Sequence, residues 1–183
     1  MTDPNCVDVL VLYATAKGST RGIAERIASC LRTGGTRVAV RSVADTSPLP
    51  SCAALVFGSA IHDRQWLPAA EDMAGRIAEE CGVTAPVWAF SVSSVGSTST
   101  LLSSRLADFL RPRTPEPLAV QRLRKQVPLR DHRWFAGSIA PGDWPGVGRV
   151  VFRLMGGHYR DARDWPDIEQ WARRIESAVH SST

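Results

Sequence analysis

The 183-residue sequence lacks several features that would place it in a specialised class of proteins. Its four cysteines are scattered without a CxxC pair, so it predicts no zinc site, disulfide framework or iron–sulfur cluster. No apolar run approaches the roughly 20 residues that a membrane-spanning helix needs. The first residues, Met1 to Pro4, lack the charged and then apolar pattern of a signal peptide. We therefore expect a reduced, cytoplasmic protein without a metal site.

Acidic residues are outnumbered, and the imbalance is local. Lysine and arginine total 22 against 18 aspartates and glutamates, for a net charge of +4. The segment 111–133, here called the basic segment, holds seven basic and two acidic residues, and so carries +5 by itself. It can be a solvated surface, or a docking surface for an anionic ligand or for the anionic face of a membrane. Aromatic residues are not interleaved with these cations, which argues against nucleic acid as a partner.

The membrane interpretation would bring the protein to the cytoplasmic face of the membrane as a peripheral protein. It depends on neighbouring cations and apolar residues of the basic segment. The cations would attract anionic lipid, and the apolar side chains would add contact with it. The residues concerned are Arg122, Arg124, Lys125, Leu118, Val120 and Leu123.

Apolar runs alternate with amphipathic segments along the chain. The patterns predict strands over 7–13, 37–43, 53–60, 86–92 and 134–139, and helices over 19–32, 66–81, 100–110 and 164–179. Five strands alternating with helices predict one α/β domain with a doubly wound parallel sheet. The basic segment then reads as an insertion before the last strand. Segment 141–157, with its apolar stretch 147–155, is too short for a second domain.

Ligands of such sheets bind beyond the carboxyl ends of the strands. The loop after the first strand combines three hydroxyl side chains with a glycine directly before a helix: Thr15, Ala16, Lys17, Gly18, Ser19 and Thr20. Hydroxyl and backbone N–H donors at a helix N-terminus suit a phosphate, although a single hydroxyl that caps the helix is the alternative. The loop is not a Walker A motif, because its lysine precedes the glycine, and GxGxxG is absent.

Two further loops, GSAIH at 58–62 and SVSSVG at 91–96, follow later predicted strands. The pattern Thr-x-x-Gly-x-Thr at 15–20 resembles the FMN phosphate loop of the flavodoxin family. The ordered set GSAIH, FSV (90–92), FAG (135–137), LMGGHYRD (154–161) and DWxxIxxWARxI (164–175) resembles the menaquinone-dependent protoporphyrinogen IX dehydrogenase branch of that family. The similarity extends over nearly the whole chain.

The resemblance implies a flavodoxin-like fold with strand order 2-1-3-4-5, helices on both faces and one FMN. Residues 15–20 would hold the phosphate of the cofactor. The flavin ring would be lined by residues of the two later loops, namely Ser59, Ala60, Ile61, His62, Ser93, Ser94, Val95 and Gly96. His62 is the catalytic candidate by position alone.

The resemblance also implies oxidation of a porphyrinogen-like substrate with a quinone as electron acceptor. A single-electron carrier and an FMN-dependent quinone reductase are the alternatives. Carriers of the family tend to be acidic, which the net charge of +4 does not match. Two departures from the family stand out: the loop at 91–96 has no aromatic residue to stack on the flavin, and Lys17 adds a cation to a loop that is usually uncharged. Trp66 is expected to be a core residue at the start of a helix.

Overall fold

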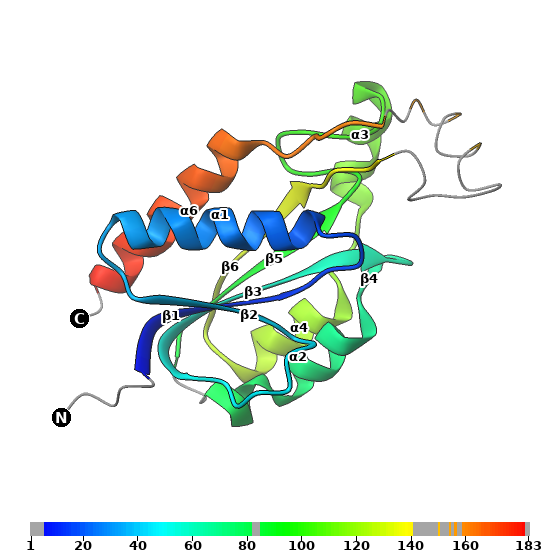
Figure 1. Ribbon diagram of the computed structural model, residues 1–183. Coiled ribbons are helices and arrows are strands. Elements are labelled where there is room, and N and C mark those ends of the chain that lie inside the picture. The colour runs from blue at the N-terminus through cyan, green and yellow to red at the C-terminus, as the bar shows by residue number, and fades with distance from the viewer. Residues whose placement is uncertain are drawn as a thin grey trace.

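The computed structural model describes residues 6–81, 85–140, 150, 154, 156 and 159–181. A parallel sheet forms its centre, with strands in the order β2-β1-β3-β5-β6 (Figure 1). These strands are β1 (Cys6–Ala14), β2 (Val38–Ser42), β3 (Ser51–His62), β5 (Val87–Ser93) and β6 (Leu129–Ala136). Counted along the chain, the five parallel strands have the predicted order 2-1-3-4-5, which confirms the fold class. A two-residue strand that was not predicted, β4 (Gln65–Trp66), pairs antiparallel with β3.

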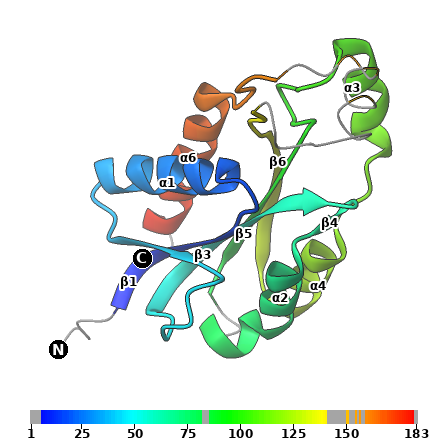
Figure 2. The ribbon, with the colours of Figure 1, turned by 45° about the vertical axis from the view of Figure 1, so that its right-hand side comes forward.

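Helices cover both faces of the sheet. Helices α1 (Ser19–Thr33) and α6 (Trp165–His180) lie on one face, and α2 (Pro68–Cys81) and α4 (Leu118–Gln126) lie on the other (Figures 1 and 2). The short helices α3 (Ser104–Leu110) and η1 (Arg111–Arg113) lie beyond the carboxyl ends of β5 and β6. Within the part of the chain that is described, no helix is both long enough and apolar enough to cross a membrane.

The first strand shows why its sequence is apolar without interruption. Successive side chains of a strand point to opposite faces of the sheet. Val9 and Val11 pack in the layer of α1 and α6, whereas Leu10 and Leu12 pack in the layer of α2 and α4. All four side chains are fully buried. A strand covered on both faces cannot alternate apolar with polar residues, so the run was a reliable strand signal.

The last strand begins five residues earlier than predicted, at Leu129. The prediction failed because residues 130–133 are polar, and the structure supplies partners for them. Asp131 accepts a hydrogen bond from Trp171 Nε1 of α6 at 2.7 Å, and Arg133 forms an ion pair with Asp167 of the same helix. Because Asp131 and Arg133 are two residues apart on a strand, both point to the face of the sheet that α6 covers.

The basic segment is therefore not a separate insertion. It comprises η1, α4 and the start of β6, and α4 is the crossover helix between β5 and β6. Val120 and Leu123 of α4 are fully buried in the layer with α2, which corrects their assignment as apolar contacts for a membrane. Leu118 is the exposed apolar residue at the start of α4.

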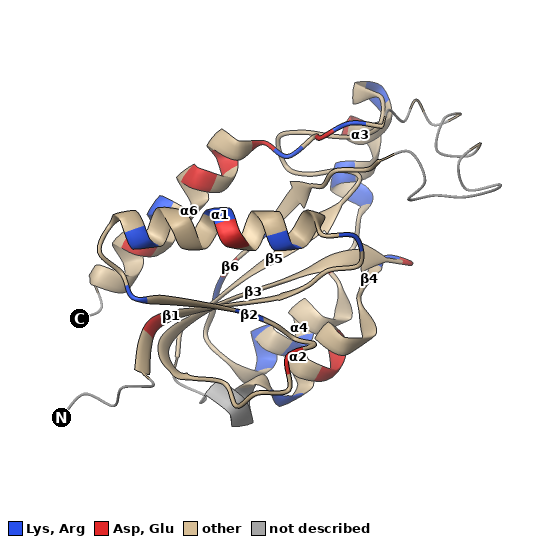
Figure 3. Ribbon diagram, in the orientation of Figure 1, with Lys and Arg blue, Asp and Glu red and all other residues tan. Residues whose placement is uncertain are grey.

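Most cations of the basic segment have carboxylate partners. Figure 3 shows acidic residues of α2 beside the basic residues of α4. Four of the seven basic side chains form ion pairs, with three of the partners outside the segment: Arg111 with Asp108, Arg122 with Glu71, Arg124 with Glu116 and Arg133 with Asp167. The net charge of the segment is thus largely compensated by its neighbours.

Two predicted helices begin later than expected. Helix α2 begins at Pro68 because Trp66 belongs to β4, where its side chain is buried as a core residue. Helix α3 begins at Ser104 because the preceding residues form a loop with an isolated bridge from Val95 to Thr100. The apolar stretch predicted at 147–155 lies outside the described residues, apart from residues 150 and 154.

Candidate functional site

A cavity of about 400 Å³ opens at the carboxyl ends of the parallel strands. It lies where the order of strands reverses, between β1 and β3, which is the position of ligand sites in doubly wound sheets. Ten of the fourteen residues predicted to bind a cofactor line it, from all three predicted loops: Thr15, Ala16, Lys17, Ser19, Thr20, Ala60, Ile61, His62, Ser93 and Ser94.

The N-terminus of α1 forms one end of this cavity. Gly18 precedes the helix with φ of 86°, in the left-handed region that favours glycine. Its N–H donates to Thr15 Oγ1 at 2.9 Å, so that hydroxyl shapes the turn. The Gly22 N–H bonds to the Gly18 carbonyl at 3.1 Å, and the N–H groups before it have no acceptor within the helix.

No side chain caps this helix, so the capping alternative for its hydroxyls does not hold. Ser19 Oγ instead accepts a hydrogen bond from the Ser138 N–H at 2.9 Å, which ties α1 to the chain after β6. Thr20 Oγ1 is buried and has no hydrogen-bond partner among the described residues, and the residue is 1% exposed. Leaving a hydroxyl buried and unpaired destabilises a protein by about 1–3 kcal/mol. A bound acceptor such as a phosphate oxygen would satisfy it.

The charge of the cavity also favours an anion. Among the described lining residues, the ionisable side chains other than hydroxyls are Lys17 and His62, and neither aspartate nor glutamate is present. Lys17 forms no ion pair in the described structure. The partial positive charge of the α1 N-terminus adds to that of Lys17. These residues fit the dianionic phosphate of FMN.

The hairpin of β3 and β4 forms the opposite wall. Its turn residues Asp63 and Arg64 both have positive φ, 48° and 66°, as a two-residue hairpin loop requires. The His62 side chain is 75% exposed, and its Nδ1 lies 3.3 Å from a carboxylate oxygen of Asp63. His62 lines the 400 Å³ cavity and also an adjacent cavity of about 420 Å³ beside α2.

Four predicted residues do not line the cavity. Gly18 sets the turn before α1, as described above. Ser59 is fully buried, and its hydroxyl donates to the Ala60 carbonyl at 2.8 Å and accepts from the Leu67 N–H at 3.1 Å. Ser59 therefore stabilises the hairpin through these hydrogen bonds and does not contact the cavity.

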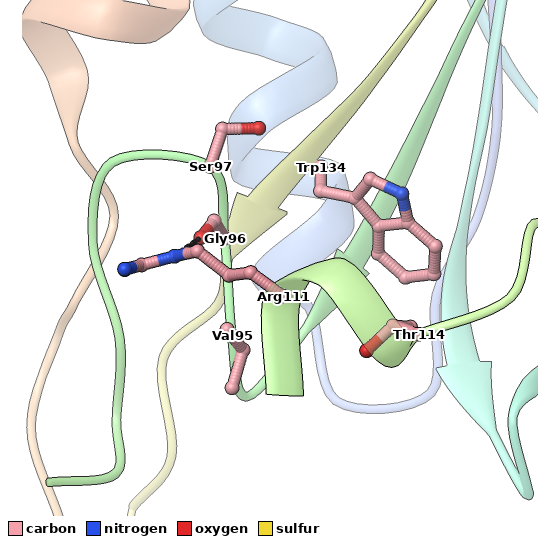
Figure 4. A pocket seen from close by; sticks show the side chains of 6 residues that line it. All are labelled: Val95, Gly96, Ser97, Arg111, Thr114 and Trp134. Atoms are coloured by element: carbon pink, nitrogen blue, oxygen red, sulfur yellow. Dashed lines mark hydrogen bonds between the residues drawn. The ribbon is translucent and has the colours of Figure 1, made fainter. Parts of the chain in front are cut away.

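Val95 and Gly96 face a second cavity of about 210 Å³, together with Ser97, Arg111, Thr114 and Trp134 (Figure 4). Gly96 lies against the end of β6, where an added Cβ would be 2.3 Å from the Ala136 nitrogen. Arg111 Nε donates to the Gly96 carbonyl at 2.9 Å, and Figure 4 shows its guanidinium directed away from Trp134. The loop after β5 thus separates two cavities.

Six lining residues were not predicted as site residues: Leu67, Val92, Leu101, Gly137, Ser138 and Ile139. The first three are apolar and cannot be told from core residues in a sequence. The others were assigned to the last strand, which ends at Ala136. Gly137 could have been predicted as a site residue because it ends the FAG motif. In the structure it lies close to α1, where an added Cβ would be 2.8 Å from Ser19 Oγ.

Solved structures share this fold. A flavodoxin from the domain Archaea aligns over 94% of this chain and 99% of its own, with 15% identity and a TM-score of 0.57. A mutant of the flavodoxin from Pseudomonas aeruginosa aligns over 94% and 99%, with 12% identity and a TM-score of 0.59. A mutant of the flavo-diiron protein from Thermotoga maritima has 13% identity and a TM-score of 0.56, but the alignment spans 97% of this chain and 36% of that protein. No curated protein has a significantly similar sequence.

The sequence itself gives the family. Residues 10–139, more than half of the chain, match the flavodoxin domain family. That region contains most of β1, all of β2 to β6 and all three loops of the cavity. The chain therefore belongs to the flavodoxin domain family, and its cofactor is FMN.

Proposed function

We propose that this chain is an FMN-dependent oxidoreductase that takes electrons from a small, porphyrinogen-like substrate and delivers them to a quinone. The observation that carries the proposal is the cavity beyond β1, β3 and β5, which has an anion-binding end and no aromatic side chain among its described lining residues. The motifs at 58–62, 90–92, 135–137, 154–161 and 164–175, which resemble protoporphyrinogen dehydrogenases, support the substrate class.

In this proposal, the loop at 15–20 holds the phosphate. The backbone N–H groups at the start of α1 and the Thr20 hydroxyl donate to its oxygens, and Lys17 offsets its charge. Ala60, Ile61, Ser93 and Ser94 line the flavin ring from two sides. The chemistry that FMN supplies when bound is the acceptance and release of electrons. Ser59, Val95 and Gly96 act indirectly, by fixing the hairpin and the loop after β5.

The missing aromatic side chains favour an enzyme over an electron carrier. With no ring stacked on the flavin from the described residues, one face of the flavin stays accessible to a second flat molecule. Direct contact of this kind is needed for transfer between the cofactor and a small substrate. A carrier needs only an exposed flavin edge and a charged docking surface. The described residues of the cavity lining offer no acidic group for such a surface.

His62 is the residue we assign to proton exchange with the substrate. It lies at the mouth of the cavity, and its imidazole is exposed and close to the Asp63 carboxylate. Imidazole is the side chain that most often serves in general acid–base catalysis. Its exposure allows exchange with water after each transfer.

The membrane contact belongs to the same proposal, because a long-chain quinone resides in the bilayer. Lys125 and Arg130 have no carboxylate partner among the described residues, and Leu118, at the start of α4, is an exposed apolar residue of the same segment. These three residues would make the contact. Replacing Lys125 and Arg130 by Ala should reduce pelleting with anionic vesicles at low salt more than replacing Arg122 and Arg124, which are already paired. Equal pelleting of both variants would contradict this contact.

The decisive assay uses FMN-loaded protein under anaerobic conditions. Reduced protoporphyrin and a short-chain naphthoquinone are supplied without a partner protein, and porphyrin fluorescence is followed. We expect fluorescence to rise only when protein and quinone are both present. Quinone reduction by a nicotinamide donor without porphyrin oxidation would favour the quinone reductase instead. Electron transfer that requires a redox protein would favour the carrier.

A further inference from the structure

A line of buried hydrogen bonds runs across the sheet beneath the cofactor cavity. Trp66 Nε1 of β4 donates to Ser91 Oγ of β5 at 2.8 Å, and Ser91 Oγ lies 2.9 Å from His132 Nε2 of β6. His132 Nδ1 in turn lies 3.3 Å from a carboxylate oxygen of Glu116, which Arg124 of α4 holds at 2.7 Å. The line thus joins the β3–β4 hairpin to the segment before α4.

One arrangement of hydrogens satisfies the donors and acceptors along this line. An indole nitrogen can only donate, so the Ser91 oxygen accepts from Trp66. The Ser91 hydrogen is then free to bond to His132 Nε2 when that nitrogen carries no hydrogen. The hydrogen on His132 Nδ1 faces the Glu116 carboxylate. Every group is satisfied when His132 is neutral and carries its proton on Nδ1.

The order Ser91, His132 and Glu116 has the geometry of a hydrolase triad, but no substrate can reach it. Ser91 is 0% exposed, and the His132 side chain is 5% exposed. Burial lowers the pKa of His132, against the opposing effect of Glu116. The other charged groups that act on the imidazole are Arg124 of α4, which lowers its pKa further, and Asp131 of β6, which raises it.

The line ends at the wall of the cofactor cavity. Trp66 pairs in register with Ile61, and its ring packs edge-on against Phe57 at 4.9 Å. Ile61 and the neighbouring Leu67 line the cavity. Because β4 is only two residues long, the backbone alone gives little to hold the hairpin in place. Trp66 is therefore its main anchor, and the bond to Ser91 sets the orientation of that anchor.

We propose that Ser91, His132 and Glu116 are positioning residues for the hairpin that contacts FMN, and that they hold it only while His132 is neutral. A proton on Nε2 would turn His132 into a second donor toward Ser91 Oγ. The Ser91 hydrogen would then lose its acceptor inside the protein, and an unpaired buried group is unfavourable. Trp66 and protonated His132 would then both donate to Ser91 Oγ, which weakens the bond that holds the hairpin. The cofactor half of this inference, that the hairpin contacts FMN, rests on the proposed function. The other half, that the hydrogen bonds of His132 hold the hairpin, does not.

The test uses three variants at a series of pH values from 8 to 5. His132→Gln keeps an acceptor near the Nε2 position and cannot titrate, whereas His132→Leu removes the acceptor. His180→Gln is the matched control, because it removes an exposed histidine at the end of α6. Stability of the protein without FMN is measured by urea denaturation, and FMN affinity by quenching of flavin fluorescence.

The pKa of His132 is lowered in the folded protein, so the unfolded chain binds the extra proton first. The contribution of neutral His132 to stability should therefore be fully present above the unfolded pKa of about 6.5. As the pH is lowered below that value, the folding equilibrium constant should decrease by at most tenfold per pH unit. His132→Gln should remove this component, and His180→Gln should retain it. His132→Leu should be less stable throughout. FMN affinity should fall with pH in the parent more steeply than in His132→Gln.

Parallel stability curves of the parent and His132→Gln without FMN would overturn the inference. Parallel curves of FMN affinity alone would overturn its cofactor half. Absence of FMN binding at pH 7.5 would contradict the proposed function instead, and the comparison without FMN would still decide whether His132 holds the hairpin.

Discussion

The unpaired hydroxyl of Thr20 gives the sharpest test of the cofactor site, because it predicts opposite effects on stability and on binding. Thr20→Val keeps the branched shape of the side chain and removes the hydroxyl. Thr20 Oγ1 is buried without a hydrogen-bond partner in the part of the chain that the structure describes. Removing it should stabilise the protein without FMN by about 1–2 kcal/mol, within the range for an unpaired buried polar group. For a chain of this size, that raises Tm by roughly 2–8 °C.

The same substitution should weaken the binding of FMN. A hydrogen bond to a charged acceptor such as a phosphate contributes about 1.5–3 kcal/mol. Its loss should raise the Kd for FMN by about 10- to 150-fold, since each 1.4 kcal/mol is a factor of ten. Binding is measured by flavin fluorescence quenching, and stability by urea denaturation of the protein without cofactor.

Thr36→Val is the matched control. Thr36 is 5% exposed, and its Oγ1 also has no hydrogen-bond partner, but it follows the other end of α1 and lies outside the cavity lining. It should stabilise the protein by a similar amount and leave the Kd for FMN within about twofold. The reasoning is refuted if Thr20→Val fails to stabilise the protein without FMN, or if it binds FMN as tightly as the parent.

Three further variants test other parts of the site. Lys17→Gln should raise the Kd for FMN up to about fivefold at low salt, with the difference lost at high salt and absent for riboflavin. Gly96→Ala should destabilise the protein by about 1–3 kcal/mol in urea, because the new Cβ meets the backbone of Ala136. Asp63→Asn combined with Arg64→Gly should raise stability by about 1 kcal/mol, measured by thermal unfolding, since both residues have positive φ.

The sequence predicted the centre of the sheet well because burial on both faces leaves a simple pattern. β1, β3 and β5 are continuous apolar runs, and their predicted bounds differ from the observed ones by at most two residues. β6 was missed at its start because its polar residues find partners only in the folded protein, in Asp167 and Trp171 of α6. Such partners lie more than 30 residues away and leave no local trace.

The hairpin and the second cavity were hidden for different reasons. The turn of β3 and β4 uses Asp63 and Arg64, whereas a sequence-based rule expects glycine or asparagine at positive φ. The loop at 91–96 was predicted to face one ligand, but it crosses the end of β6 with Gly96 against Ala136. Its two halves therefore face different cavities. This geometry depends on the close packing of two backbones, which residue types alone do not specify.

The central claim is that the N-terminus of α1 and the loop at 15–20 hold the phosphate of FMN at the carboxyl end of the sheet. The most direct measurement is a titration of the folded, cofactor-free protein with FMN and with riboflavin, which lacks the phosphate. We predict one FMN bound per chain, with riboflavin bound at least tenfold more weakly, the loss expected for a charge-assisted hydrogen bond. Equal affinity for the two flavins, or no uptake of either by folded protein, would contradict the account.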